Sequence, residues 1–235
     1  MWQAAWKLVG HDLSRAWGNY LLMLVISFIF GVWTGLMVLR TLISQEFTLD
    51  PYLIDFYFMA VIPIIGCPWY TRKHTERTYS QLKYYRTLPI STGSVILSRM
   101  ILVFLRAIPN AILLFAGMYL VSPALREVLP PSSYLWFIAI CFGYGLGMSC
   151  WYPYWEIHSR SKVKLWLYTG GYVVAWLAVC AIVWFVFDEH IVRNVIDWSK
   201  TSGWIFALLS ALFGGVSAWI WWRITKKNVD DGVLF

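Results

Sequence analysis

Three polar residues, Arg99, Arg106 and Asn110, interrupt an otherwise apolar stretch of this chain. Their spacings of seven and four place all three on one face of a helix. A charged group inside a membrane-spanning helix is costly and usually faces protein or a water-filled cavity. We therefore predict that Arg106 and Asn110, together with Asp55 in a second apolar stretch, contact a path through the membrane or its lipid. Two alternatives remain: Arg106 extends its guanidinium to the inner headgroups, and Asp55 lies in a wet outer vestibule.

The motifs of several enzyme classes are absent from the sequence. There is no G-x-x-x-x-G-K-[ST] to bind ATP phosphates and no H-E-x-x-H to hold a catalytic zinc. The four His residues lie in separate segments without ligand spacing, and the four Cys residues lie in apolar segments without a C-x-x-C pair. We therefore expect no catalytic residue, no metal site and no cofactor held by this chain.

Apolar side chains dominate the elements that position these residues. Of the 235 residues, 60% are apolar and only 13% are charged, whereas a soluble domain has about 25% charged residues. The apolar residues form blocks near the roughly 20 residues that a membrane-spanning helix needs. Because a helix satisfies its own backbone hydrogen bonds in lipid, we predict an all-α membrane protein with a single transmembrane domain, residues 1–235.

The apolar blocks predict six membrane-spanning helices. They cover residues 20–39, 51–69, 95–121, 134–151, 165–187 and 202–222. Residues 1–19 show apolar side chains at a period near 3.6, with Trp on one face and Lys and Arg on the other. This pattern predicts an amphipathic helix lying flat in the headgroup layer. Residues 223–235 are predicted to form a tail.

The basic residues are distributed unevenly around the predicted spans. With the N-terminus in the cytoplasm, all but four of the 19 Lys and Arg residues lie on the inner side. The four exceptions are Arg40, Arg126, Arg193 and Lys200. The positive-inside rule then predicts a multi-pass protein of the cell membrane with both termini in the cytoplasm. This topology accounts for the net charge of +7, so we expect no nucleic-acid partner.

The longest inner loop, residues 70–94, joins the second and third predicted spans. Its polar stretch is compatible with a short cytoplasmic helix up to Thr87, and Pro89 ends that helix. Ser91 or Thr92 can cap the helix that follows. Aromatic side chains lie among the charges of this loop, as is typical of the anchors of a protein interface. The alternative is a solvated basic loop that only sets the topology.

The sequence Thr87-Leu-Pro-Ile-Ser91, followed by Val95-Ile-Leu-Ser-Arg99, resembles a motif of ABC transporter permeases of the type-two export class. In that family the motif follows a coupling helix that docks on the ATPase subunit, and the resemblance extends to the six spans. Many members have charged residues where this chain has Thr92-Gly93-Ser94. The resemblance implies a set of ATPase-coupling residues. They are Glu76, Tyr79, Lys83, Tyr84, Arg86, Leu88 and Pro89.

The resemblance implies a permease subunit of an ATP-driven exporter, not itself an enzyme. Such a subunit forms a homodimer, or a heterodimer with a sister permease, in the lipid bilayer. Separate ATPase subunits bind the ATP and Mg. Aromatic-rich, charge-poor spans suit a hydrophobic or amphipathic cargo such as a peptide, lipid or drug. The alternative is an ion-coupled secondary transporter or channel, although the spans hold few ionisable groups. A membrane-embedded enzyme would need converging acid–base groups, which the sequence does not offer.

Small residues recur at helical spacing in two of the predicted spans. Gly31-x-x-x-Gly35 lies in the first span and Gly143-x-x-x-Gly147 lies in the fourth. This spacing lets helix backbones approach closely, either within one chain or between two chains. In the family that the chain resembles, the first span lines the dimer interface, which implies that Gly31 and Gly35 contact a partner permease.

Overall fold

The computed structural model of this protein describes its helical framework. The described residues are 1–36, 55–59, 62, 90–154, 170–171, 174–175, 177–182, 184–185 and 190–230. Within these ranges every regular element is a helix and none is a strand. The all-α prediction is therefore confirmed for this part of the chain.

Six helices have defined bounds. They are α1 (Trp2–Thr34), α5 (Thr92–Val121), α6 (Pro123–Val128), α7 (Pro131–Ser149), α10 (Ile191–Thr201) and α11 (Gly203–Asp230). Four of them, α1, α5, α7 and α11, are long and apolar enough to cross a membrane, and they indicate a membrane-embedded protein. They overlap the first, third, fourth and sixth predicted spans. The second, residues 51–69, lies largely outside the described residues, and of the fifth, residues 165–187, the described pieces 170–171, 174–175, 177–182 and 184–185 are all helical.

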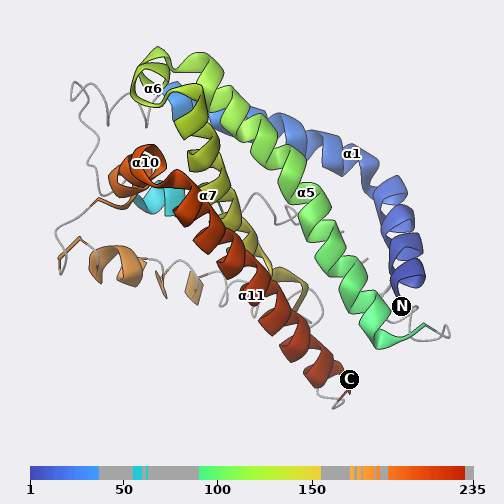
Figure 1. Cartoon of the computed structure of the whole chain (residues 1–235). Helices are drawn as coiled ribbons and strands as arrows, with labels where there is room; N and C mark the ends of the chain where they lie inside the picture. The colour runs from blue at the N-terminus through green and yellow to red at the C-terminus, as the bar shows by residue number, and fades with distance from the viewer. Residues whose placement is uncertain are drawn as a thin grey trace.

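Three boundaries differ from the sequence-based predictions. Helix α1 runs through residues 19 and 20 without a break, because Gly18 lowers helix propensity by about 1 kcal/mol but still supplies its N–H. Figure 1 shows that α1 instead bends within its N-terminal half. Helix α5 begins at Thr92, inside the predicted loop 70–94. Helix α11 continues to Asp230, through most of the predicted tail, because Lys and Arg are good helix formers.

Helices α1 and α5 lie side by side and run parallel (Figure 1). Asp12 of α1 lies beside Arg99 of α5, and Tyr20 lies beside Leu105 two turns further along both helices. The contact continues to Gly31 near the end of α1. Residue numbers rise together along the two helices, which fixes their relative direction.

Gly31 and Gly35 of α1 pack directly on α5. A Cβ at Gly31 would collide with the Leu114 carbonyl group, and a Cβ at Gly35 would lie 2.8 Å from the Met118 carbonyl oxygen. Gly117 makes the reciprocal approach, since its Cβ would lie 2.9 Å from a carbonyl oxygen of α1. Of the two alternatives for this glycine motif, contact within one chain or between two chains, the structure shows contact within one chain. Because α5 already fills this glycine face, the dimer contact implied for Gly31 and Gly35 would require α5 to move away.

Helices α7 and α11 form a second parallel pair (Figure 1). A Cβ at Gly143 would collide with Ser210, and a Cβ at Gly147 would collide with the Phe213 ring. Further along, the Ser217 hydroxyl donates a hydrogen bond to the Gly147 carbonyl oxygen at 2.5 Å. The second glycine motif therefore also serves packing within the chain.

The main hydrophobic core lies at one end of the bundle, where α6 and α10 sit (Figure 1). It contains Phe58, Leu114, Phe115, Met118, Leu125, Leu129, Tyr134, Phe137, Val192 and Ile196. Here α5 joins α7 through the Tyr134 hydroxyl, which donates to the Phe115 carbonyl oxygen at 2.6 Å. About half of the most apolar window of α5 and of α7 is buried, at 50% and 56%, against 11% for α1 and 22% for α11. Helices α5 and α7 are therefore central, and α1 and α11 are peripheral.

The start of α1 and the end of α11 lie at the other end of the bundle (Figure 1). The Ser94 hydroxyl at the start of α5 donates to the Met1 carbonyl oxygen at 3.3 Å. Ile96 of α5 packs with Val229 near the end of α11. The beginning of the chain and the end of its last helix are thus both held by the first turns of α5.

Candidate functional site along helix α5

Helix α5 begins directly after the Leu-Pro-Ile-Ser sequence. Ser91 is its N-cap residue and has an extended backbone, which confirms the predicted capping position. The Ser91 hydroxyl lies 2.8 Å from the Ser94 hydroxyl. A Cβ at Gly93 would lie 3.2 Å from the Met1 sulfur. Small residues at this position therefore leave room for the N-terminus of α1.

The predicted ATPase-coupling residues lie outside the described residues. They are Glu76, Tyr79, Lys83, Tyr84, Arg86, Leu88 and Pro89. Their role stays a prediction. The described structure resumes at Ile90, immediately before the α5 N-cap.

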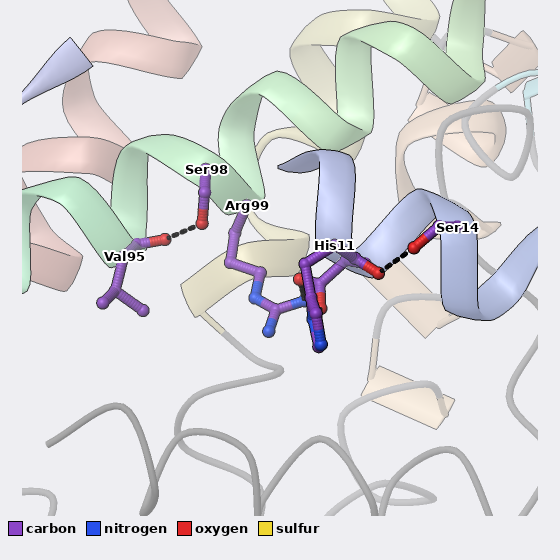
Figure 2. A network of polar contacts seen from close by, with 6 residues as sticks. His11, Ser14, Val95, Ser98 and Arg99 are labelled. Carbon is purple, nitrogen blue, oxygen red and sulfur yellow. Dashed lines mark hydrogen bonds and ion pairs between the residues drawn. The ribbon is translucent and has the colours of Figure 1, made fainter. Parts of the chain in front are cut away.

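Two turns into α5, Arg99 forms a buried ion pair with Asp12 of α1. The Arg99 Nη1 atom lies 3.1 Å from the Asp12 Oδ2 atom, and the two side chains are only 4% and 7% exposed. Figure 2 shows the Arg99 side chain extending from α5 to the turn of α1 that holds His11. The His11 Nδ1 atom lies 3.6 Å from the other Asp12 oxygen. Removing one partner of a buried pair typically costs about 3–5 kcal/mol, because the other charge is left buried without a counter-charge, so each of these two side chains depends on the other at the α1–α5 contact.

Asp12 is the functional residue that the sequence-based analysis missed. The amphipathic pattern of residues 1–19 predicts a surface helix, and a single acidic residue on such a helix does not indicate a buried contact. A charge count offers the missing clue: no other acidic residue precedes Glu46, and Arg99 inside a predicted span needs a counter-charge. The structure shows that Asp12 supplies it.

Near its middle, α5 is joined to α1 by a hydrogen bond that compensates for a proline. Pro109 has no N–H to donate to the carbonyl group of Leu105, four residues earlier. The Tyr20 hydroxyl donates to that Leu105 carbonyl oxygen at 2.6 Å. The freed backbone group is thus satisfied from α1, and the proline stays within a continuous helix.

Arg106 and Asn110, the predicted path or lipid contacts, flank this proline. Arg106 is half-buried and acts electrostatically on the Tyr20 hydroxyl. Asn110 is 1% exposed and belongs to the interior of the bundle. The structure therefore places Arg99, Arg106 and Asn110 along α5 as predicted, but buries them to different degrees. Contact with cargo or lipid stays a prediction for Arg106 and Asn110.

Asp55 lies at the opposite end of the bundle and binds the N-terminus of α10. Its two carboxylate oxygens accept hydrogen bonds from the backbone N–H groups of Ile191 and Val192, each at 2.9 Å. The Trp184 indole N–H donates to the same carboxylate at 3.1 Å, and Asp55 is 1% exposed. A carboxylate at a helix N-terminus satisfies unpaired N–H groups and complements the helix dipole. This geometry gives Asp55 a role in holding α10. The contact of Asp55 with a translocation path or with lipid stays a prediction.

Helix α10 itself was not predicted, because the sequence analysis treats its residues as an outer loop. Val192, Ile196 and Ser199 form its buried side, and its Trp198 ring stacks on Phe206 of α11 at 4.5 Å between ring centroids. A helix this short is marginal in isolation. Its stability therefore comes from docking on the core and from Asp55.

The described residues thus offer two polar sets, a line along α1 and α5 and the Asp55 carboxylate with Trp184, His190 and the start of α10. In the described ranges no group of three His, Cys, Asp or Glu side chains could hold a metal ion. Comparison of the chain with known protein families, with curated proteins and with solved structures finds no match. The fold and the site together indicate a helical, membrane-embedded protein.

Proposed function

We propose that this chain is the permease subunit of an ATP-driven exporter of the ABC type-two class. Two observations support the proposal. The first is the sequence Thr87-Leu-Pro-Ile-Ser91 between two apolar stretches. The second, which carries most weight, is the way α5 links that sequence to α1. The proposed cargo is hydrophobic or amphipathic, such as a peptide, lipid or drug.

The parallel helix pairs support a six-span topology. Helix α1 and helix α5 run in the same direction, so the chain between residues 36 and 90 has to return to the starting end. The same reasoning applies to α7 and α11, which are also parallel. One return crossing in each interval gives six spans, and the predicted spans 51–69 and 165–187 fall in those two intervals. Because the start of α1 and the end of α11 share one end of the bundle (Figure 1), an even number of crossings fits, and we propose that both termini lie in the cytoplasm.

The α1–α5 contact supports a route for mechanical coupling. A movement of the predicted coupling helix, residues 75–87, would reach α5 directly, since Ser91 is the N-cap of α5. Helix α1 would follow, because the Asp12–Arg99 ion pair and the Gly31 contact fasten it to α5 at both ends. In this proposal the ATPase subunit moves α1 and α5 together as one body past the rest of the bundle.

The proposed assembly contains two permeases and two separate ATPase subunits, which hold the ATP and Mg. The Gly31 and Gly35 face is filled by α5 of the same chain. A homodimer or heterodimer would therefore use another surface, and the outward sides of α1 and α11 are the least buried of the long helices.

Purification of the tagged chain from its native membranes in mild detergent tests the proposal. We expect a P-loop ATPase to copurify in a fixed ratio. The double variant Tyr84→Ala/Arg86→Ala should lose it while keeping a normal elution profile and thermal stability. Arg126→Ala, an exposed charge on α6 at the opposite end, is the matched control and should keep the ATPase. Absence of any ATPase in several mild detergents would contradict the proposal.

An ion-coupled secondary transporter or channel is a second candidate. The observation that favours it is that both buried carboxylates of the described residues have a histidine nearby: His11 with Asp12, and His190 with Asp55 at 3.7 Å. Transport in reconstituted vesicles separates the two candidates. Uptake that follows an imposed ion gradient and ignores ATP would favour the second.

A further inference from the structure

The last turns of α11 expose paired aromatic and basic side chains. The Arg223 guanidinium lies over the Trp219 ring, 4.9 Å from its centroid. One turn further, the Lys226 ammonium lies over the Trp222 ring at 5.6 Å. Spacings of three and four residues put these four side chains on one face of the helix. A cation over an aromatic ring is held by the ring quadrupole, so both positive charges have defined positions.

The two charges are not neutralised by the protein in the part of the chain that the structure describes. Its ion pairs use Asp12 and Asp55 as the acidic partners, and neither contacts Arg223 or Lys226. Both basic side chains are exposed. Trp222 packs with Ile96 of α5, which anchors the Lys226 end of this face against the bundle.

Apolar side chains continue from these charges toward the middle of α11. The exposed fraction is 57% for Trp219, 54% for Val216 and 56% for Leu212, which follow one another on this face at spacings of three and four residues. Arg223 stands about 30 Å along the helix from Gly203, which is about the thickness of the hydrocarbon core. The face is thus apolar at acyl-chain depth and cationic at headgroup depth.

We propose that this face of α11 binds an anionic phospholipid, with the phosphate between Arg223 and Lys226 and an acyl chain along Trp219, Val216 and Leu212. The argument is charge complementarity joined to an apolar track of the right depth. A soluble anion would use the charges only, and a second copy of the chain would bring the same two cations against each other. The proposal is independent of the ATPase-coupled transport proposed above.

Native mass spectrometry of the purified full chain tests this site, with phosphatidylglycerol as the probe and phosphatidylcholine as the zwitterionic comparison. We expect retention of phosphatidylglycerol over phosphatidylcholine. Each basic residue near an anionic headgroup contributes about a fivefold preference. Arg223→Gln/Lys226→Gln should therefore weaken phosphatidylglycerol binding by roughly 25-fold.

Matched variants separate this site from a general charge effect. Arg193→Gln/Lys200→Gln removes two exposed charges from α10 at the opposite end and should leave binding unchanged. Arg223→Lys/Lys226→Arg keeps both charges and should retain most of it. Three results would overturn the proposal. The α10 variant could lose as much phosphatidylglycerol binding as the α11 variant, or the unaltered chain could retain phosphatidylglycerol and phosphatidylcholine equally. The third is that inorganic phosphate stabilises the chain as much as phosphatidylglycerol does.

Discussion

Helix pair α1–α5 and helix pair α7–α11 are both parallel, and in both pairs glycines let the backbones approach closely. Gly31 and Gly35 meet the backbone of α5, and Gly143 and Gly147 meet side chains and backbone of α11. The two pairs differ in the polar groups that join them. In the first pair these are the Asp12–Arg99 ion pair and the Tyr20–Leu105 hydrogen bond.

In the second pair, the described hydrogen bonds between the two helices come from serine hydroxyl groups. Ser210 donates to the Ala139 carbonyl oxygen at 3.3 Å, and Ser217 donates to the Gly147 carbonyl oxygen. Such bonds between helices in a membrane contribute about 0.6 kcal/mol each. Removing one partner of a buried ion pair costs far more free energy of unfolding than losing one such hydrogen bond. We therefore expect α1 and α5 to move as one body, and α7 and α11 to shift past each other more readily.

Breaking the ion pair should have the largest effect. Arg99→Met leaves the Asp12 carboxylate buried without its arginine, and we expect a loss of about 3–5 kcal/mol in the free energy of unfolding. Chemical unfolding in detergent micelles measures it. Arg126→Met, at an exposed site on α6, is the control and should change stability little.

A double variant shows whether the loss arises from the uncompensated charge. Asp12→Leu/Arg99→Met removes both charges, and replacing a buried pair by apolar residues is often close to neutral. The double variant should therefore be more stable than Arg99→Met alone. If it is equally unstable or less stable, the loss in Arg99→Met does not come from an uncompensated Asp12 carboxylate.

Alanine at the glycines should distinguish the two pairs at the next level. Gly31→Ala brings a Cβ against the Leu114 backbone, which cannot rotate away, so we expect a loss of about 1–3 kcal/mol. Gly147→Ala meets the ring of Phe213, a partly exposed side chain that can turn, and should cost less. The same unfolding measurement compares them.

Two glycines serve as controls for this comparison. Gly18 in α1 and Gly215 in α11 have open space where a Cβ would lie. Alanine at either position should be neutral or stabilising by up to about 1 kcal/mol, because alanine favours the helix. Equal losses at Gly31 and Gly18 would mean that close approach to α5 is not the reason for Gly31.

The sequence alone predicts which helices exist better than it predicts what they touch. Four long apolar blocks became α1, α5, α7 and α11, because length and apolar composition are local properties. The glycine spacings were also evident, but a small-residue face does not specify its partner. Gly31 and Gly35 fit α5 of the same chain or a helix of a second chain equally well until the Leu114 contact is seen.

The polar contacts were harder to predict because their partners are far apart in sequence. Asp12 and Arg99 belong to different helices, and Asp55 caps α10 from more than a hundred residues away. Helix α10 was missed for the same reason, since so short a helix forms only with the core and the Asp55 carboxylate beside it. The start of α5 could be predicted directly, because an N-cap serine acts locally.

The hydrogen bond from Tyr20 should have a smaller effect than the glycine contacts. Tyr20→Phe leaves the Leu105 carbonyl without a donor, and we expect a loss of about 1 kcal/mol. In a Pro109→Ala background the alanine N–H can bond that carbonyl, so the same Tyr20→Phe change should then cost less. A double-mutant cycle from unfolding data measures the coupling. Equal costs in both backgrounds would contradict the proposed compensation for Pro109.

The serines of the second pair should give the smallest effects, in a defined order. The Ser217 hydroxyl donates to Gly147 of α7, so Ser217→Ala should cost about 0.6 kcal/mol. The Ser210 hydroxyl lies 3.0 Å from the Ala207 carbonyl oxygen of its own helix, closer than the 3.3 Å to Ala139. Ser210→Ala should therefore cost less than Ser217→Ala in the same unfolding measurement. A loss at either serine as large as that of Arg99→Met would erase the distinction between a firmly fastened pair and a looser one.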